Sequence, residues 1–272
     1  MCFTQSMSAA FALLGYLSAF ICWKASRNAE CTKAIAFFSL METLQAVQYS
    51  FIADDLEDAR CLTFANQLLT FLGYLHIQFQ PYFTNMFFKS FRPALGKSKP
   101  GEEFAWAVVM KLCLVQCGLG LLRLALGPGL DGSRLTADER DHYRVSKDWL
   151  DGPKLCTYHG AFHLAWSMPL AQPTYFLGGL GVHCFMMFAP ALCIGGWGEV
   201  DAVAFLVLTG PVMASFVSSN LQEQASIWCF FSMLQCAIGA SSAVLQSRAV
   251  AAKTKAGARK TPAPAAKKGK AK

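Results

Sequence analysis

Long apolar stretches separated by short polar connections make up most of this chain. Most of these stretches approach or exceed the ~20 residues that a helix needs to cross about 30 Å of hydrocarbon. The pattern therefore predicts an all-α, polytopic membrane domain over residues 1–247, with one long extramembrane loop at residues 127–173. The seven predicted transmembrane helices are residues 8–23, 34–53, 62–88, 104–126, 174–194, 202–217 and 226–245.

Positive charges in the connections indicate how these helices are oriented. Lys and Arg accumulate in short loops on the cytoplasmic side of a membrane. The first and third connections are basic, whereas the second, DDLEDAR at residues 54–60, is acidic. An odd number of helices with the amino terminus outside therefore places both basic connections and the carboxyl terminus in the cytosol. The basic residues of these two connections are Lys24, Arg27, Lys33, Lys89, Arg92, Lys97 and Lys99.

Composition agrees with a membrane location. Hydrophobic residues make up 54% of the 272 residues and charged residues 15%, against about a quarter in soluble proteins. The net charge of +7 comes from residues 248–272, which hold nine of the 24 Lys and Arg residues. We expect this Lys/Ala/Pro-rich segment to be a disordered cytosolic tail, either solvated or attracted to anionic lipids. It lacks base-reading side chains, so the expected partner is the lipid bilayer and not nucleic acid.

Polar side chains recur within the predicted helices. The second helix has a polar face around Glu42, and the third has a polar stripe on one face and His76 on another. A helix with two polar faces cannot turn either of them to lipid, so the third helix should be central. Together these side chains form a candidate intramembrane ligand site. Its candidate residues are Glu42, Gln45, Gln67, Tyr74, His76, Gln78 and His183.

Glu42 is the leading candidate, because an ionisable side chain at the membrane centre costs at least ~2.5 kcal/mol to insert. We expect its carboxyl group to face Tyr74 and Gln78 and to be protonated, away from any cation. Glu42→Leu should then cost more stability than Glu42→Gln, because it leaves those partners unpaired. Two interpretations stay open: a polar cavity that binds a small ligand or ion, as in receptors and transporters, or hydrogen bonds that only hold helices together.

His159 and His163 lie four residues apart in the long loop. If that segment is helical, both imidazoles share one face and form a weak candidate for a metal site. Seven-helix hydrolases of the alkaline ceramidase type add a further His and an Asp to such a pair, but no predicted helix here contains an Asp. A metal-dependent membrane hydrolase is therefore one alternative function, and a structural or assembly protein is another.

Other enzymatic motifs are missing from the sequence. It contains no P-loop, nucleophile elbow or HExxH motif, and the seventh predicted helix has no lysine for a retinal Schiff base. The sequence therefore leaves the cofactor unknown, and it favours a protein that is not an enzyme without deciding the question.

Three of the eleven cysteines fall on the predicted outer side, namely Cys2, Cys61 and Cys156. Oxidising compartments permit disulfides. We favour a bridge between Cys61 and Cys156, which would tie the long loop to the start of the third helix. A bridge from Cys2 to either of them, or free thiols, are the alternatives.

Two short motifs carry a resemblance to a known family. The opening MCFTQSMSAAF and the later SIWCFF, at residues 226–231, resemble motifs of an uncharacterised multi-pass membrane protein family. Bacterial members open with Met-Cys-Phe-Ser-Ala and carry Ser-Val-Trp-Cys-Phe-Phe near the last helix. The resemblance spans the membrane body and excludes the tail. It implies seven helices and no known activity.

Overall fold

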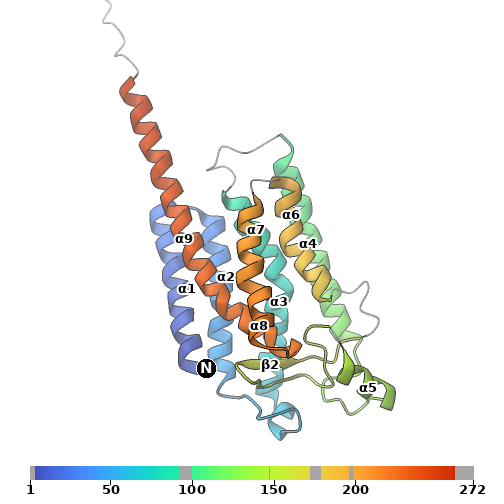
Figure 1. Ribbon diagram of the computed structural model, residues 1–272. Helices are drawn as coiled ribbons and strands as arrows, with labels where there is room; N and C mark the ends of the chain where they lie inside the picture. Colours follow the sequence, from blue (N-terminus) through green and yellow to red (C-terminus); the bar gives the residue numbers. More distant parts are fainter. Residues whose placement is uncertain (1–3, 92–99, 147, 172–178, 196–198, 261–272) are drawn as a thin grey trace, which may run out of the picture.

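The computed structural model describes residues 4–91, 100–146, 148–171, 179–195 and 199–260, except for the side chains of residues 144, 145 and 253–260. Long helices run side by side through this part of the chain (Figure 1). They are α1 (Gln5–Ser26), α2 (Ala29–Gln48), α3 (Phe64–Phe91), α4 (Glu102–Ala125), α6 (Leu180–Gly195), α7 (Val200–Val207) continued by α8 (Met213–Val217), and α9 (Leu221–Lys260).

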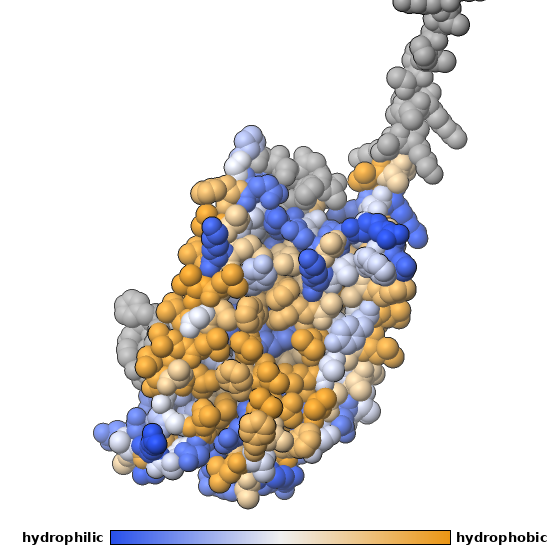
Figure 2. Space-filling view, turned by 180° about the vertical axis from the view of Figure 1, so that it is seen from behind, coloured by the Kyte–Doolittle hydropathy of each residue, from blue (hydrophilic) through white to orange (hydrophobic). Residues whose placement is uncertain are grey.

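Four helices among the described residues are long and apolar enough to cross a membrane: α1, α4, the α7–α8 segment Val200–Val217, and Leu221–Ala252 of α9. The other three predicted spans coincide with α2, α3 and α6. Of these, α6 is apolar but shorter, with 16 residues, and polar side chains interrupt α2 and α3. Figure 2 shows a broad hydrophobic surface between two more hydrophilic ends.

Polar caps define the starts of α1 and α2 and allow the tight turn between the two helices. Thr4 caps α1 by accepting a hydrogen bond from the backbone N–H of Met7. At the other end, Arg27 adopts a left-handed conformation with φ of 57°. Asn28 then caps α2 by accepting from the backbone N–H of Cys31. Polar caps satisfy the N–H groups that a helix start leaves unpaired, so α2 begins directly after α1 ends.

The third helix is central, as its two polar faces predict. α3 packs against α2, α4 and α6, and its first half also contacts the strand β1 (Cys156–His159). Pro81 lies inside α3 and cannot donate a backbone hydrogen bond. One turn later, Nδ2 of Asn85 donates a hydrogen bond to the carbonyl of Pro81 at 2.7 Å. The same Nδ2 also donates to the carbonyl of Met186 at 2.7 Å, which ties α3 to α6.

A β-hairpin corrects the expectation of an all-α chain. β1 pairs antiparallel with β2 (Leu164–Ser167), with Cys156 opposite Ser167 and His159 opposite Leu164. The turn needs a glycine, because a Cβ on Gly160 would collide with the Glu223 side chain and the His163 carbonyl. The remaining part of the long loop contains α5 (Ala137–Val145), which begins with a capping box between Thr136 and Glu139.

The end of the chain also differs from expectation. Disorder was expected from residue 248, but α9 continues to Lys260. Alanine and lysine are good helix formers, and they dominate residues 249–260. The rest of the expected tail, residues 261–272, lies outside the described residues.

Candidate functional site

Glu42 lies in the interior of the helix bundle. Its side chain is fully buried, and neither carboxylate oxygen has a hydrogen-bond partner among the described residues. The carboxyl group lies beside the hydroxyl of Ser8 on α1 and within electrostatic reach of Cys229 on α9. Gln45 follows one turn later on α2, fully buried and with both amide atoms unpartnered in the described structure. Ser8, Glu42 and Gln45 thus form a cluster of buried polar groups, which we call the Glu42 cluster.

The expected neighbours of Glu42 lie elsewhere, so that expectation is wrong. The Tyr74 hydroxyl donates to the carbonyl of Gly120 on α4 at 2.7 Å. The Gln78 side chain covers the same glycine. Both residues therefore face α4, whereas Glu42 faces α1 and α9. The Arg123 guanidinium pairs with Asp148 at 2.8 Å and so does not neutralise Glu42.

The other candidates on α3 are also dispersed. His76 donates from Nε2 to the carbonyl of Phe37 at 2.8 Å. Its ring stacks on the Phe37 ring, with centroids 3.9 Å apart. Gln67 lies on a mostly apolar groove between α3 and α4, beside Phe64 and Leu68. The seven candidate residues therefore do not form one site.

His183 belongs to a second group of polar side chains. The amide oxygen of Gln80 on α3 accepts from Nε2 of His183 at 3.3 Å. The Gln80 amide nitrogen donates to the sulfur of Cys229 at 3.3 Å. Each of these residues is buried. This chain crosses from α6 through α3 to α9, and Cys229 links it to the surroundings of Glu42.

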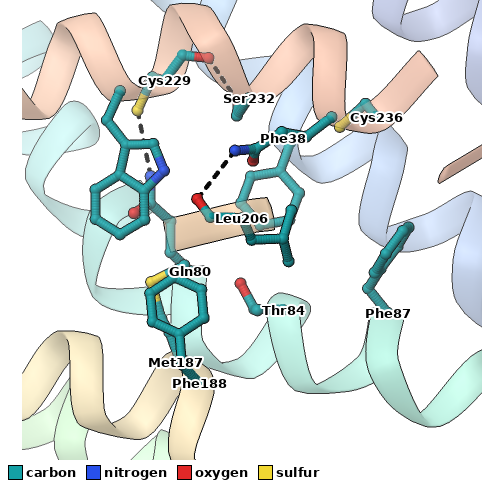
Figure 3. Close-up of a pocket in the computed structure, with 12 residues that line it drawn as sticks. Phe38, Gln80, Thr84, Phe87, Met187, Phe188, Leu206, Cys229, Ser232 and Cys236 are labelled. Carbon is teal, nitrogen blue, oxygen red and sulfur yellow. Dashed lines mark hydrogen bonds between the residues drawn. The ribbon is translucent and has the colours of Figure 1, made fainter. Parts of the chain in front are cut away.

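Gln80 and Cys229 line a cavity between α3, α6, α7 and α9 (Figure 3). Its volume is about 40 Å³, enough for a few waters at ~10–15 Å³ of accessible volume each. Half of its twelve lining residues are aromatic or aliphatic, and two more are cysteines. Thr84 is polar, and its buried hydroxyl points toward the cavity and has no partner in the described structure. Gln80, Gln235 and Ser232 supply the other polar groups.

A π-helical turn, Leu208–Val212, packs against Trp228, which lines this cavity. It contains Pro211 and joins α7 to α8. Trp228 of α9 approaches the backbone of this turn so closely that a Cβ on Gly210 would collide with its indole. Turns of this kind are frequent at functional sites. Here the turn brings an aromatic cavity wall against α7 and α8.

The hairpin closes one end of the bundle through polar contacts that sequence reasoning missed. Asn66, Thr70 and Gln48 all bond to Thr157 of β1. The Gln48 amide also accepts from Nε1 of Trp166 on β2 at 3.3 Å. Gln48 on α2 and Thr70 on α3 therefore hydrogen-bond to the hairpin. Neither side chain lines the cavity of Figure 3.

His159 and His163 do not form a helical pair. The segment is a hairpin, in which His159 is exposed and His163 is buried. Nδ1 of His163 lies 2.7 Å from the Tyr49 hydroxyl, and burial lowers the pKa of His163 to about 3. Among the described residues, no group of three or more His, Cys, Asp or Glu side chains is placed to hold a metal ion.

A disulfide joins the 3-10 turn before α3 to the hairpin. The sulfur atoms of Cys61 and Cys156 are 1.99 Å apart. This is the pair that the sequence analysis favours. Cys2, the alternative partner, lies outside the described residues.

Comparison with known proteins places the chain in a family. The model of a family of unknown function, DUF5765, matches residues 6–249. The chain belongs to this family. The match confirms the resemblance to an uncharacterised family that the SIWCFF motif carries, and it extends from the first turn of α1 into α9. No curated protein and no solved structure matches the chain.

Proposed function

We propose that this DUF5765 member is a seven-span membrane protein with its amino terminus outside and its carboxyl terminus in the cytosol. The hydrophobic surface between hydrophilic ends supports this proposal (Figure 2). The described amino-terminal end, the hairpin and α5 lie at one end of the bundle, and the end of α9 projects at the other (Figure 1). The last turns of α1 and α3, which carry Lys24 and Lys89, then lie on the side toward which α9 ends.

Within that bundle, we propose that the Glu42 cluster binds a proton or an alkali cation. The observation that carries this proposal is the unpartnered, fully buried carboxyl group of Glu42. An uncompensated buried charge is costly, so a buried carboxyl group either pairs with a cation or is protonated. Buried polar groups without protein partners also point to a bound water or ion.

The single carboxylate of the Glu42 cluster limits the ligand to one positive charge. The cluster carries one carboxylate, and its other oxygen ligands, from Ser8 and Gln45, are neutral. Hard cations prefer such oxygen ligands. Nearby basic side chains are occupied or exposed: Arg123 pairs with Asp148, Lys89 pairs with Glu30, and Lys111 is exposed. A receptor-like or transporter-like role follows from such a site more directly than hydrolysis.

The test measures thermal unfolding of the full chain in lipid nanodiscs. Chlorides of Li⁺, Na⁺, K⁺ and choline are compared at equal ionic strength, at several pH values. A bound cation should raise the unfolding temperature with the logarithm of its concentration, following RT ln(1 + [L]/Kd). Proton binding should instead appear as an infrared carboxylic acid band that titrates.

Glu42→Gln should abolish either response. Glu57→Gln, which removes a carboxylate that is 89% exposed, is the matched control and should respond like the wild type. If wild type and Glu42→Gln respond identically to every cation and to pH, the cluster has only a structural role.

A further inference from the structure

A small cavity lies between α3, α4, α6 and the long loop, apart from the Glu42 cluster. Its lining includes Tyr74, Gln78, Arg123, Trp149 and His183. Its volume is about 20 Å³, which matches one or two waters at ~10–15 Å³ each.

Two residues that line this cavity, Arg123 and Gln78, each carry one unpaired polar atom in the described structure. Nη2 of Arg123 and Oε1 of Gln78 are both buried and have no hydrogen-bond partner among the described residues. The two side chains are 1% and 4% exposed, respectively. A water molecule accepts from a guanidinium and donates to an amide oxygen, so a single water satisfies both groups. We propose that this cavity is a hydration site, held by Gln78 and Arg123.

The charge of the site favours water over an anion. Arg123 Nη1 donates to Oδ2 of Asp148 at 2.8 Å, and Arg123 Nε donates to the carbonyl of Ala171 at 3.1 Å. Asp148 also accepts from the backbone N–H of Leu180 at the start of α6, at 3.0 Å. The guanidinium is therefore already neutralised, and a buried anion would add an unpaired charge. A neutral hydrogen-bonding ligand of water's size fits.

The proposed water lies between a large polar pocket and the cavity of Figure 3. Asp148 lines a polar outer pocket of about 720 Å³, together with Asp151, Tyr143 and Asn220. Its partner Arg123 lines the small cavity, as does His183. His183 in turn bonds to Gln80, which lines the 40 Å³ cavity of Figure 3. The hydration site thus bridges the outer pocket and the polar interior, and extends solvent inward to His183.

Radiolytic hydroxyl-radical footprinting of the full chain in nanodiscs tests this site, because bound water produces radicals beside buried side chains. The reporters are Trp149 and Tyr74, which line the cavity. The dry reference is Trp166, which is fully buried and whose Nε1 donates to Gln48. Each signal is normalised to that of the unfolded protein. We expect labelling of Trp149 and Tyr74 above that of Trp166.

Gln78→Leu removes the acceptor and should reduce the labelling of Tyr74 to the level of Trp166. Gln116→Leu is the matched control, because Gln116 is also buried on this side of the bundle but does not line the cavity. Its labelling should equal that of the wild type. Wild-type reporters no more labelled than Trp166, or labelling that Gln78→Leu leaves unchanged, would overturn the proposal. The wild-type comparison alone decides the matter if Gln78→Leu does not fold.

Discussion

The side-chain amide of Asn66 pairs with both backbone polar groups of Thr157. Its Nδ2 donates to the Thr157 carbonyl at 2.8 Å, and its Oδ1 accepts from the Thr157 N–H at 3.0 Å. This helix side chain therefore takes the place of a neighbouring strand at the edge of β1. Buried backbone groups need such partners, so α3 determines where the hairpin sits.

Asn66→Leu should destabilise the protein by about 1–3 kcal/mol, because it leaves the buried N–H of Thr157 unsatisfied, whereas the Thr157 carbonyl still accepts from the backbone N–H of Ala53. Thermal unfolding in detergent measures the loss. Gln67→Leu, at the neighbouring half-buried position, is the control and should change stability by less than about 1 kcal/mol. Equal effects of the two substitutions would mean that the hairpin does not depend on Asn66.

The Cys61–Cys156 disulfide should be present in the purified protein. Mass spectrometry without reductant should detect one linked peptide pair, and reduction should release it. Cys61→Ser, Cys156→Ser and the double variant should lose similar stability, about 2–4 kcal/mol, since each removes the same bridge. Cys193→Ser, which removes an exposed free thiol, is the control. Complete alkylation of both cysteines without reductant would show that the bridge does not form.

Acid should destabilise the hairpin through His163. Burial lowers its pKa from 6.5 to about 3, so the unfolded chain binds a proton at pH values where the folded protein does not. Stability should fall as the pH drops from about 6.5 toward 3, by up to about 1.4 kcal/mol per pH unit. Unfolding midpoints measured from pH 7 to pH 4 test this slope. His163→Gln should flatten it, whereas His159→Gln, at the exposed position, should leave it as in the wild type.

Asp151 acts in the opposite direction. Burial raises its pKa, although hydrogen bonds from Ser146 and His142 partly offset this effect. A raised carboxyl pKa means that the folded state binds the proton more readily than the unfolded state, which adds stability at low pH. The wild-type profile therefore contains both contributions, and only the difference between wild type and His163→Gln isolates the imidazole.

The sequence predicted burial better than it predicted neighbours. An acidic side chain within an apolar helix is costly to expose to lipid. The burial of Glu42 inside the bundle therefore follows from solvation alone. Its neighbours depend on which helix packs against each face of α2, and local periodicity does not contain that information. Tyr74 and Gln78 share a stripe with Gln67, and this stripe faces α4. Gln67 lies on the apolar groove between α3 and α4, whereas Tyr74 and Gln78 contact Gly120 of α4.

The sequence does not predict the hairpin either, because the contacts that stabilise it are not local. The spacing of His159 and His163 fits a helix as well as a turn between two short strands. What stabilises the strands comes from elsewhere in the chain: Asn66 on α3, Gln48 on α2, and the carboxylate of Glu223 on α9. That carboxylate accepts from the backbone N–H groups of Phe162 and His163. Such partners lie 60 to 118 residues away, beyond any local pattern.

The structure removes the reason for expecting a high cost of Glu42→Leu, because the expected partners Tyr74 and Gln78 contact Gly120 on α4. Among the described residues, neither oxygen of Glu42 has a hydrogen-bond partner, and the Ser8 hydroxyl is the polar group beside it. Without a bound cation, Glu42→Leu should therefore cost little or should stabilise the protein, because it removes a buried unsatisfied group. Gln48→Leu is the matched comparison two turns along α2. It loses bonds to Leu69, Thr157 and Trp166, and should cost about 2–4 kcal/mol. Unfolding in choline buffer measures both variants. A larger loss for Glu42→Leu than for Gln48→Leu would contradict this ranking.

The locations of a carboxyl-terminal reporter and of a tag in the long loop test the number of membrane spans. A reporter fused after Lys272 should be cytosolic, whereas a site between residues 131 and 146 should be reachable from outside. Asp138→Cys suits the second position, because Asp138 is exposed on α5. In a Cys2→Ser, Cys193→Ser background, which removes the amino-terminal thiol and the exposed thiol of α6, an impermeant maleimide should label this cysteine in intact cells.

Glu103→Cys, at an exposed position in the first turn of α4, provides the opposite control and should react only after permeabilisation. These two sites lie at the two ends of α4, so opposite accessibility requires α4 to cross the membrane. The segments from α6 onward then decide where the carboxyl terminus lies. If α6, the α7–α8 segment and α9 all span, the terminus is on the side of Glu103. A reporter after Lys272 on the side of Asp138 would mean that one of these segments does not cross, and the short α6 would be the first to examine.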